Sequence, residues 1–136
     1  MKLFLDTNVV LDFVLNRTPF SEDASLIIEI SSIRKFEIYI SSTSITDIYY
    51  ILSKKYTKKI ALEFIMDLAK NFNLTNVNHS TILEAIKSNF NDFEDAVQYQ
   101  SALDYKVNFI ITRNAKDFTK SKIKVLSPND FIKKYA

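Results

Sequence analysis

Hydrophobic and polar positions divide the chain into short apolar runs and longer stretches in which apolar residues recur every three or four positions. The short runs predict strands at residues 3–5, 37–40, 74–77, 109–111 and 124–126. The longer stretches between them predict helices long enough to act as crossover connections. This alternation favours an α/β fold, a three-layer α/β/α sandwich around a central parallel sheet of about five strands.

Three helix starts are marked by a side chain that can accept a hydrogen bond from a free backbone N–H group. They lie at Thr18-Pro19, at Thr81 with Glu84 as a capping box, and at Ser127-Pro128. Apolar residues at helical spacing predict the faces that the helices bury. These faces include Ala24, Ile27, Ile28, Ile30 and Ile33; Ile45, Ile48, Tyr49 and Leu52; Ile60, Leu62, Phe64, Ile65 and Leu68; and Leu83, Ile86 and Phe90.

Composition narrows the kinds of site that the chain can build. With 136 residues, 47% of them hydrophobic, we expect residues 1–136 to form one domain around a single core. Cysteine is absent and His79, expected at the surface, is the one histidine, so any metal must be held by oxygen. Glycine is absent too, which excludes glycine-rich loops for ATP or NAD and leaves left-handed backbone positions to asparagine.

Charge and hydropathy indicate a cytoplasmic protein without a membrane segment. The first apolar run is interrupted by Asp6 before the core of a signal peptide can form, and no later run approaches the roughly 18 apolar residues of a membrane span. The net charge of +2 is too small to predict nucleic-acid binding by bulk electrostatics. A polyanionic partner would need a local group of basic residues.

Four aspartates stand at separated points in the chain, each near the end of a predicted strand or the start of a predicted helix. They are Asp6, Asp47, Asp95 and Asp117. Ligands of a parallel sheet gather at the carboxyl ends of its strands, so we expect these carboxylates to meet at one edge, with Asp95 pointing inward and Glu94 facing solvent. Like charges so placed repel by on the order of several kcal/mol and are tolerated only with a cation or shared protons.

Asp6, Asp47 and two neighbours of the other aspartates also have a purely structural interpretation. Asp6 and Asp92 suit the N-caps of the helices that follow them. Asp47, in the first turn of its helix, would stabilise that helix by roughly 0.3–1 kcal/mol through the macrodipole. Thr112 suits the N-cap of the turn that carries Asp117. The metal-site interpretation depends on several acids converging on one sheet edge.

Five stretches carry a family resemblance, in one order along essentially the whole chain. They are residues 5–12 (LDTNVVLD), 40–47 (ISSTSITD), 92–96 (DFEDA), 111–118 (ITRNAKDF) and 125–128 (VLSP). With these motifs the chain resembles the PIN domain, or PilT N-terminus, family, whose members include VapC-type toxin ribonucleases.

The resemblance implies an endoribonuclease, a hydrolase that uses Mg²⁺ or Mn²⁺ to cut RNA and leaves 5′-phosphate and 3′-hydroxyl ends. It also implies a toxin that forms a homodimer and binds a small antitoxin protein. The implied metal ligands are Asp6, Asp95 and Asp117, with Asp92 close by and Asn8, Thr112 and Asn114 as polar support. The family's second acid is most often glutamate, whereas Asp47 stands here, one methylene shorter, with a role in water orientation or indirect ligation.

Candidates for RNA contact are Arg113, beside the predicted site, and Lys54 and Lys55, which belong to a basic group with Lys58 and Lys59. Lysines near a helix end also serve as solvated partners of the helix dipole, which is the alternative for this group.

Two other classes of function fit the same sequence pattern. A binding or regulatory module would keep the fold without turnover, and Asp47 is the departure that favours it. A phosphoacceptor domain also uses an aspartate after its first strand, but Asn8 replaces the second acid of the Asp-x-Asp signature. Metal-dependent RNA cleavage that is abolished by Asp6→Asn would distinguish the enzyme from the binding module, and a stable aspartyl phosphate after acetyl phosphate treatment would favour the phosphoacceptor.

Overall fold

A computed structural model describes all 136 residues and contains one five-stranded parallel sheet with the order β3-β2-β1-β4-β5. The central strand β1 pairs with β2 on one side and β4 on the other, so the crossover direction changes at β1. The strands are β1 (Lys2–Leu5), β2 (Glu37–Ser41), β3 (Asn73–Thr75), β4 (Phe109–Ile111) and β5 (Lys124–Leu126). The predicted α/β class and the five predicted strands are confirmed.

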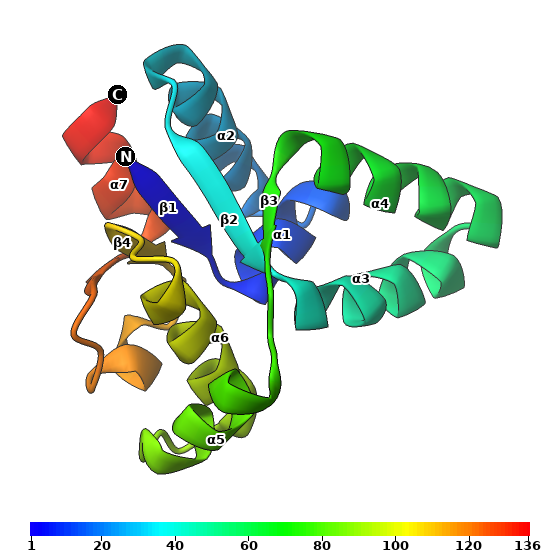
Figure 1. The fold of residues 1–136 in the computed structure, drawn as a ribbon. Coiled ribbons are helices and arrows are strands. Elements are labelled where there is room, and N and C mark those ends of the chain that lie inside the picture. The colour runs from blue at the N-terminus through cyan, green and yellow to red at the C-terminus, as the bar shows by residue number, and fades with distance from the viewer.

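Helices cover both faces of this sheet, because side chains along each strand point alternately to its two sides. Leu3 and Leu5 belong to a large core beneath α1, α2 and α7, whereas Phe4 packs in a smaller core with Tyr99 of α6. In Figure 1, α3 and α4 form a hairpin that projects away from the sheet, and α5 lies beside α6. The helices are α1 (Thr7–Val14), α2 (Ser21–Arg34), α3 (Ser42–Lys55), α4 (Lys58–Asn71), α5 (His79–Lys87), α6 (Phe93–Asp104) and α7 (Pro128–Tyr135), with a 3₁₀ turn η1 (Ala115–Phe118).

Two of the three predicted helix starts are wrong. Helix α2 begins at Ser21 rather than at Thr18-Pro19, because the carbonyl of Arg17 accepts the N–H groups of Phe20 and Ser21 and closes a turn first. 

Helix α5 begins after Asn78, whose side chain accepts the N–H of Thr81 at 3.0 Å, so Thr81 is the third residue of the capping box and not its N-cap. Ser127 caps α7 as predicted, since its hydroxyl accepts the N–H of Asp130 at 3.1 Å.

The predicted apolar faces are only partly buried. Ile33, Leu62, Leu83 and Ile86 are exposed, Ile86 at 63%, because α2, α4 and α5 each have one side on which no other element packs. Left-handed backbone falls at Asn16 and Asn89, as expected, but also at Lys35 and Lys106 (φ of 59° and 55°). Lys35 ends α2 and donates its N–H to carbonyls of the last turn. None of the helices is long and apolar enough to cross a membrane.

The parallel arrangement brings residues from distant parts of the chain to one edge of the sheet. Asp6 follows β1 and Thr112 follows β4, and these strands are neighbours with Leu5 opposite Ile111. Helix α3 begins directly after β2, on the other side of β1. Asp6 and Thr112 therefore meet at the carboxyl edge of the sheet, with the start of α3 beside them.

Candidate functional site

Asp6 is the buried centre of the site, with only 4% of its surface exposed. Its Oδ2 accepts the Thr112 hydroxyl at 2.7 Å, and its Oδ1 accepts the Gln98 side-chain amide at 3.1 Å. Asp6 occupies the N-cap position of α1, but its side chain makes no capping hydrogen bond. Asp6 is therefore the N-cap by position only, and its carboxylate is bound by Thr112 and Gln98 instead of capping the helix.

Gln98 links three helices around Asp6, and sequence reasoning did not identify it as a site residue. It is 1% exposed, and its Oε1 accepts both the N–H of Thr7 at 3.0 Å and the Thr7 hydroxyl at 3.1 Å. The Thr7 hydroxyl in turn lies 2.6 Å from that of Ser44 on α3. The one available signal was its position three residues after Asp95, on the same face of α6.

Asp95 carries the largest electrostatic perturbation among the acids. It is half-buried in the first turn of α6. Burial raises the pKa of its carboxyl to about 7, helped by the negative charges of Asp6, Asp92, Asp117 and Glu94 in that order. The negative charges of Asp6 and Asp117, from the ends of two other segments, thus act on Asp95. Asp92 caps α6, as expected, by accepting the N–H of Asp95 at 3.2 Å.

Glu94 joins this group although the sequence suggested only a solvent-facing side chain. It is exposed, but partial burial raises its pKa, as do the negative charges of Asp47, Asp92 and Asp6. Glu94 and Asp47 together line two hollows of about 320 and 230 Å³ between α3 and α6. Asp47 is the sixth residue of α3 and not in its first turn, so the dipole explanation for it is wrong.

The remaining predicted polar residues surround the loop after β4. Asp117 is exposed on η1, and Asn114 donates its backbone N–H to the Thr112 hydroxyl at 3.1 Å. The N-cap of η1 is Asn114, so the capping interpretation of Thr112 is wrong; its hydroxyl accepts the N–H of Asn114 and donates to Asp6. Asn8 is the second residue of α1, and its carbonyl accepts Nη2 of Arg17 at 3.1 Å.

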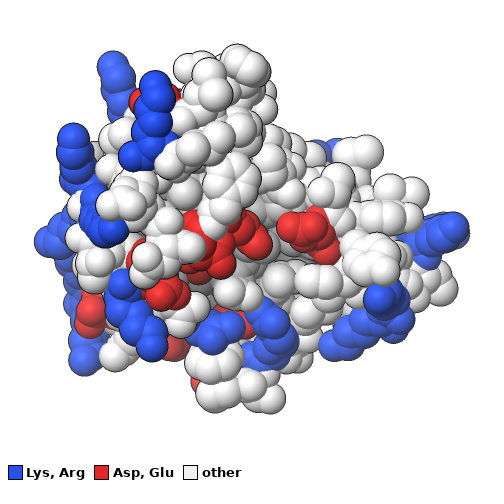
Figure 2. All heavy atoms as spheres, turned by 90° about the horizontal axis from the view of Figure 1, so that it is seen from below, with Lys and Arg blue, Asp and Glu red and all other residues white.

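The acids at this edge have no basic partners. Every salt bridge in the structure involves Asp12 or Glu84 instead. Figure 2, which looks at the molecule from below, shows acidic side chains gathered near the centre of this face and lysines and arginines mainly toward its margins. No three of the acids lie close enough together to form a closed set of metal ligands. The structure thus gathers negative charge without neutralising it.

The basic residues predicted to contact RNA differ in their surroundings. Arg113 donates Nε to Oδ2 of Asp12 at 2.7 Å, so it is held in an ion pair next to the site. Lys54 and Lys55 lie at the end of α3, where Lys54 stacks over the Tyr50 ring at 4.4 Å and Lys55 donates to the carbonyl of Leu15 at 3.2 Å.

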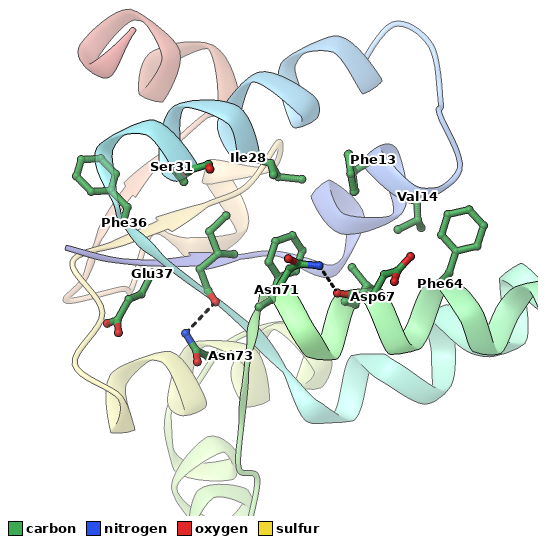
Figure 3. Close-up of a pocket in the computed structure, with 14 residues that line it drawn as sticks. Phe13, Val14, Ile28, Ser31, Phe36, Glu37, Phe64, Asp67, Asn71 and Asn73 are labelled. Atoms are coloured by element: carbon green, nitrogen blue, oxygen red, sulfur yellow. Dashed lines mark hydrogen bonds between the residues drawn. The ribbon is translucent and has the colours of Figure 1, made fainter.

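The largest hollow in the molecule lies away from the acids. It is a groove of about 770 Å³ between α1, α2, the start of β2 and α4 (Figure 3). Most of its 14 lining residues are hydrophobic, among them Phe13, Phe36 and Phe64, and its charged members are Glu37 and Asp67. A groove without a basic side chain is unsuited to RNA, so it is not the substrate site.

Comparison with known proteins gives consistent results. A family model described as PIN domain matches residues 2–116. The chain is 31% identical to Ribonuclease VapC1 of Aquifex aeolicus over 98% of this chain and 95% of that protein. 

Solved structures with the same fold include VapBC-1 from nontypeable Haemophilus influenzae (TM-score 0.70, 17% identity, 95% of this chain and 99% of that chain) and DNA-bound VapBC from Salmonella typhimurium (TM-score 0.73, 14% identity, 94% and 98%). The fold, the aspartates at the carboxyl edge of the sheet and these matches place the chain in the PIN domain family.

Proposed function

We propose that this protein is an endoribonuclease that hydrolyses RNA with the help of Mg²⁺ or Mn²⁺, acting in the cytoplasm. The observation that carries the proposal is the buried Asp6 carboxylate, held by Gln98 and Thr112 amid acids that have no basic partner. The 31% identity to a curated ribonuclease supports the reaction class. A binding module without turnover would have no need of so much uncompensated negative charge.

The donor set fits a hard divalent cation. All the candidate ligands are carboxylates. Burial, and then repulsion by the neighbouring acids, raises the pKa of Asp95, and a cation would relieve that repulsion. Asp6, Asp95 and Asp117 would hold the ion, which when bound lowers the pKa of a water and offsets charge that builds on the scissile phosphate. No three of these side chains lie close enough in the structure to hold a metal ion together. Binding would therefore require the side chains to move and water molecules to complete the set of ligands.

The neighbouring side chains would fix the geometry of the reaction. Thr112 and Gln98 hold both oxygens of Asp6, so its carboxylate cannot rotate freely. Asp47 and Glu94, across from Asp6, would accept hydrogen bonds from the attacking water and orient it. Asn8 and Asn114 would offer amide groups to the phosphate, with Asp92 keeping the start of α6 in place. In-line attack then leaves a 5′-phosphate.

We further propose that the protein is the toxin of a toxin–antitoxin pair and forms a homodimer. Several solved relatives of the same fold are described as VapBC or as a toxin–antitoxin complex. The apolar groove shown in Figure 3 suits an amphipathic protein segment better than RNA, and Glu37 and Asp67 favour basic residues in that segment. Exposed Tyr50 and Tyr56 on the α3–α4 hairpin are available to either protein partner.

The test is a cleavage assay on a labelled single-stranded RNA with Mg²⁺ or Mn²⁺, with EDTA as the metal-free arm. We expect cleavage with metal only, products that carry 5′-phosphates, and at least a hundredfold loss in Asp6→Asn. Asp130→Asn, which changes an exposed aspartate on α7, is the matched control and should cleave normally.

Cleavage that persists in EDTA or in Asp6→Asn would refute the proposed mechanism. RNA binding without any cleavage under all metal conditions would favour the regulatory module. Co-purification with the product of an adjacent short reading frame, and a dimer mass in solution, test the partner proposals separately.

A further inference from the structure

Two arginines converge on one buried carboxylate beside the acidic site. Asp12, on α1, is 1% exposed. Arg113 donates Nε to its Oδ2 at 2.7 Å and Nη2 to its Oδ1 at 3.3 Å, while Arg17 donates Nε to Oδ1 at 2.9 Å. Arg113 also lies over the Phe20 ring, with its guanidinium carbon 3.8 Å from the ring centroid. Both guanidinium groups are therefore fixed in place.

The arrangement leaves a surplus positive charge. Arg113 alone pairs Asp12 through two hydrogen bonds, so Arg17 is not needed to neutralise the buried carboxylate. A guanidinium has five N–H donors, and each of these groups uses two: Arg17 on Asp12 and the Asn8 carbonyl, Arg113 on Asp12. Their side chains are 36% and 25% exposed, so the remaining donors are accessible to a ligand.

Both arginines are attached to the segments that carry the acids. Arg113 directly follows Thr112, the partner of Asp6, and Arg17 is hydrogen-bonded to Asn8, two residues after Asp6. The site acids repel a polyanion, so an RNA substrate needs a cationic contact close by. Rigid guanidinium groups match the oxygens of a phosphate better than mobile lysines do.

We propose that Arg17 and Arg113, organised by Asp12 and Phe20, bind a backbone phosphate of the RNA next to the one that is cleaved. The proposal deepens the endoribonuclease function and rests on it for the identity of the ligand. Asp12 is a positioning residue here, because it acts only through the two arginines.

The test compares Arg17→Gln with Arg34→Gln. Arg17→Gln leaves Asp12 paired with Arg113, so the fold is retained. Arg34 is an exposed arginine at the far end of α2, where it donates to the Tyr135 carbonyl, and it provides the matched control. Binding of a fluorescent single-stranded RNA is measured by anisotropy in EDTA, over a series of salt concentrations, with urea unfolding to check folding.

We expect Arg17→Gln to raise Kd about three- to tenfold and to lower the slope of log affinity against log salt by about 0.7, the value for one phosphate contact on a single strand. Arg17→Lys should keep the slope and recover part of the affinity. In the metal-supported cleavage assay, Arg17→Gln should raise KM more than it lowers kcat.

Equal slopes for Arg17→Gln and Arg34→Gln would overturn the inference, and so would salt-independent RNA binding by the unmodified protein. The outcome of the salt-slope comparison does not depend on the outcome of the cleavage assay that tests the proposed function. A protein that binds RNA without cleaving it refutes the nuclease, and the slope comparison still decides the role of the arginine pair.

Discussion

The Thr112 hydroxyl donates a hydrogen bond of 2.7 Å to Oδ2 of Asp6, across 106 positions of sequence. The contact joins the ends of β1 and β4, the two strands that meet where the crossover direction changes. A hydrogen bond to an ionised acceptor is shorter and stronger than one between neutral groups. The contact therefore fixes the central carboxylate of the site to the loop that also carries Asp117.

Replacing Thr112 by valine should destabilise the protein and impair cleavage. Valine keeps the shape but leaves Oδ2 of the buried Asp6 without its donor, at a cost of about 1–3 kcal/mol in the free energy of unfolding. Urea unfolding measures the first effect and the RNA assay the second. Thr112→Ser keeps the hydroxyl and should retain most of both, so equal behaviour of the two variants would contradict the role assigned to this bond.

Stability without metal should fall as the pH rises toward 8. The pKa of Asp95 is raised to about 7 from an ordinary value of 3.8, so between these values the folded protein keeps a proton that the unfolded chain has lost. The folded state then binds more protons than the unfolded state, so the free energy of unfolding decreases as the pH rises through this interval. The raised pKa of Glu94 acts in the same direction.

Urea midpoints recorded in EDTA at pH 5, 6, 7 and 8 measure this trend. Asp95→Asn removes the titrating group and should flatten the decline, while Asp130→Asn should leave it unchanged. A midpoint that rises between pH 5 and 8 in the unmodified protein would show that Asp95 is not electrostatically strained.

Glu94→Gln should reduce cleavage about tenfold or more, although sequence reasoning assigned Glu94 to solvent. The glutamate lines both hollows beside Asp47, and its charge contributes to the raised pKa of Asp95. The variant should also lower the pKa of Asp95, visible as a shift of the stability profile to lower pH. Glu84→Gln, on the exposed side of α5, is the control and should change neither property.

Lys35→Gly should stabilise the protein by about 1 kcal/mol. Lys35 has a φ of 59° at the end of α2, a conformation that costs a side-chain-bearing residue roughly 1–2 kcal/mol and glycine much less. Part of the gain is lost because glycine makes the unfolded chain more flexible. Lys133→Gly, inside α7, should instead destabilise it, and a loss of stability in Lys35→Gly would contradict the interpretation.

The sequence predicted the sheet well because a buried parallel strand needs a short apolar run, and that signal is local. It also predicted that Asp6 and Asp117 follow strands, which the parallel topology then brings to one edge. Helix starts were harder. Asn78 and Thr81 both suit an N-cap by residue type; in the structure Asn78 is the N-cap, and Thr81 is its partner in the capping box.

The parts of the site that were missed depend on contacts between distant residues. Nothing in the sequence around Gln98 marks it as a site residue; its role depends on its hydrogen bonds to Asp6 and Thr7 in the folded protein. Asp12 and Arg17 are near each other in sequence, but Arg113 joins them from about a hundred positions away. Such partnerships leave no periodic pattern in a single sequence.

The central place of β1 has a consequence for how the site fails. Leu3, Phe4 and Leu5 are almost completely inaccessible, and Leu3 and Phe4 are paired with a strand on each side, so the amide protons of this segment should exchange only when the whole domain unfolds. Asp6 directly follows this segment, whereas Asp47 and Glu94 lie on helices with exposed surfaces, which we expect to open more readily. Heating to just below the melting temperature should therefore abolish activity, because the helices that carry Asp47 and Glu94 open while Asp6 stays in place.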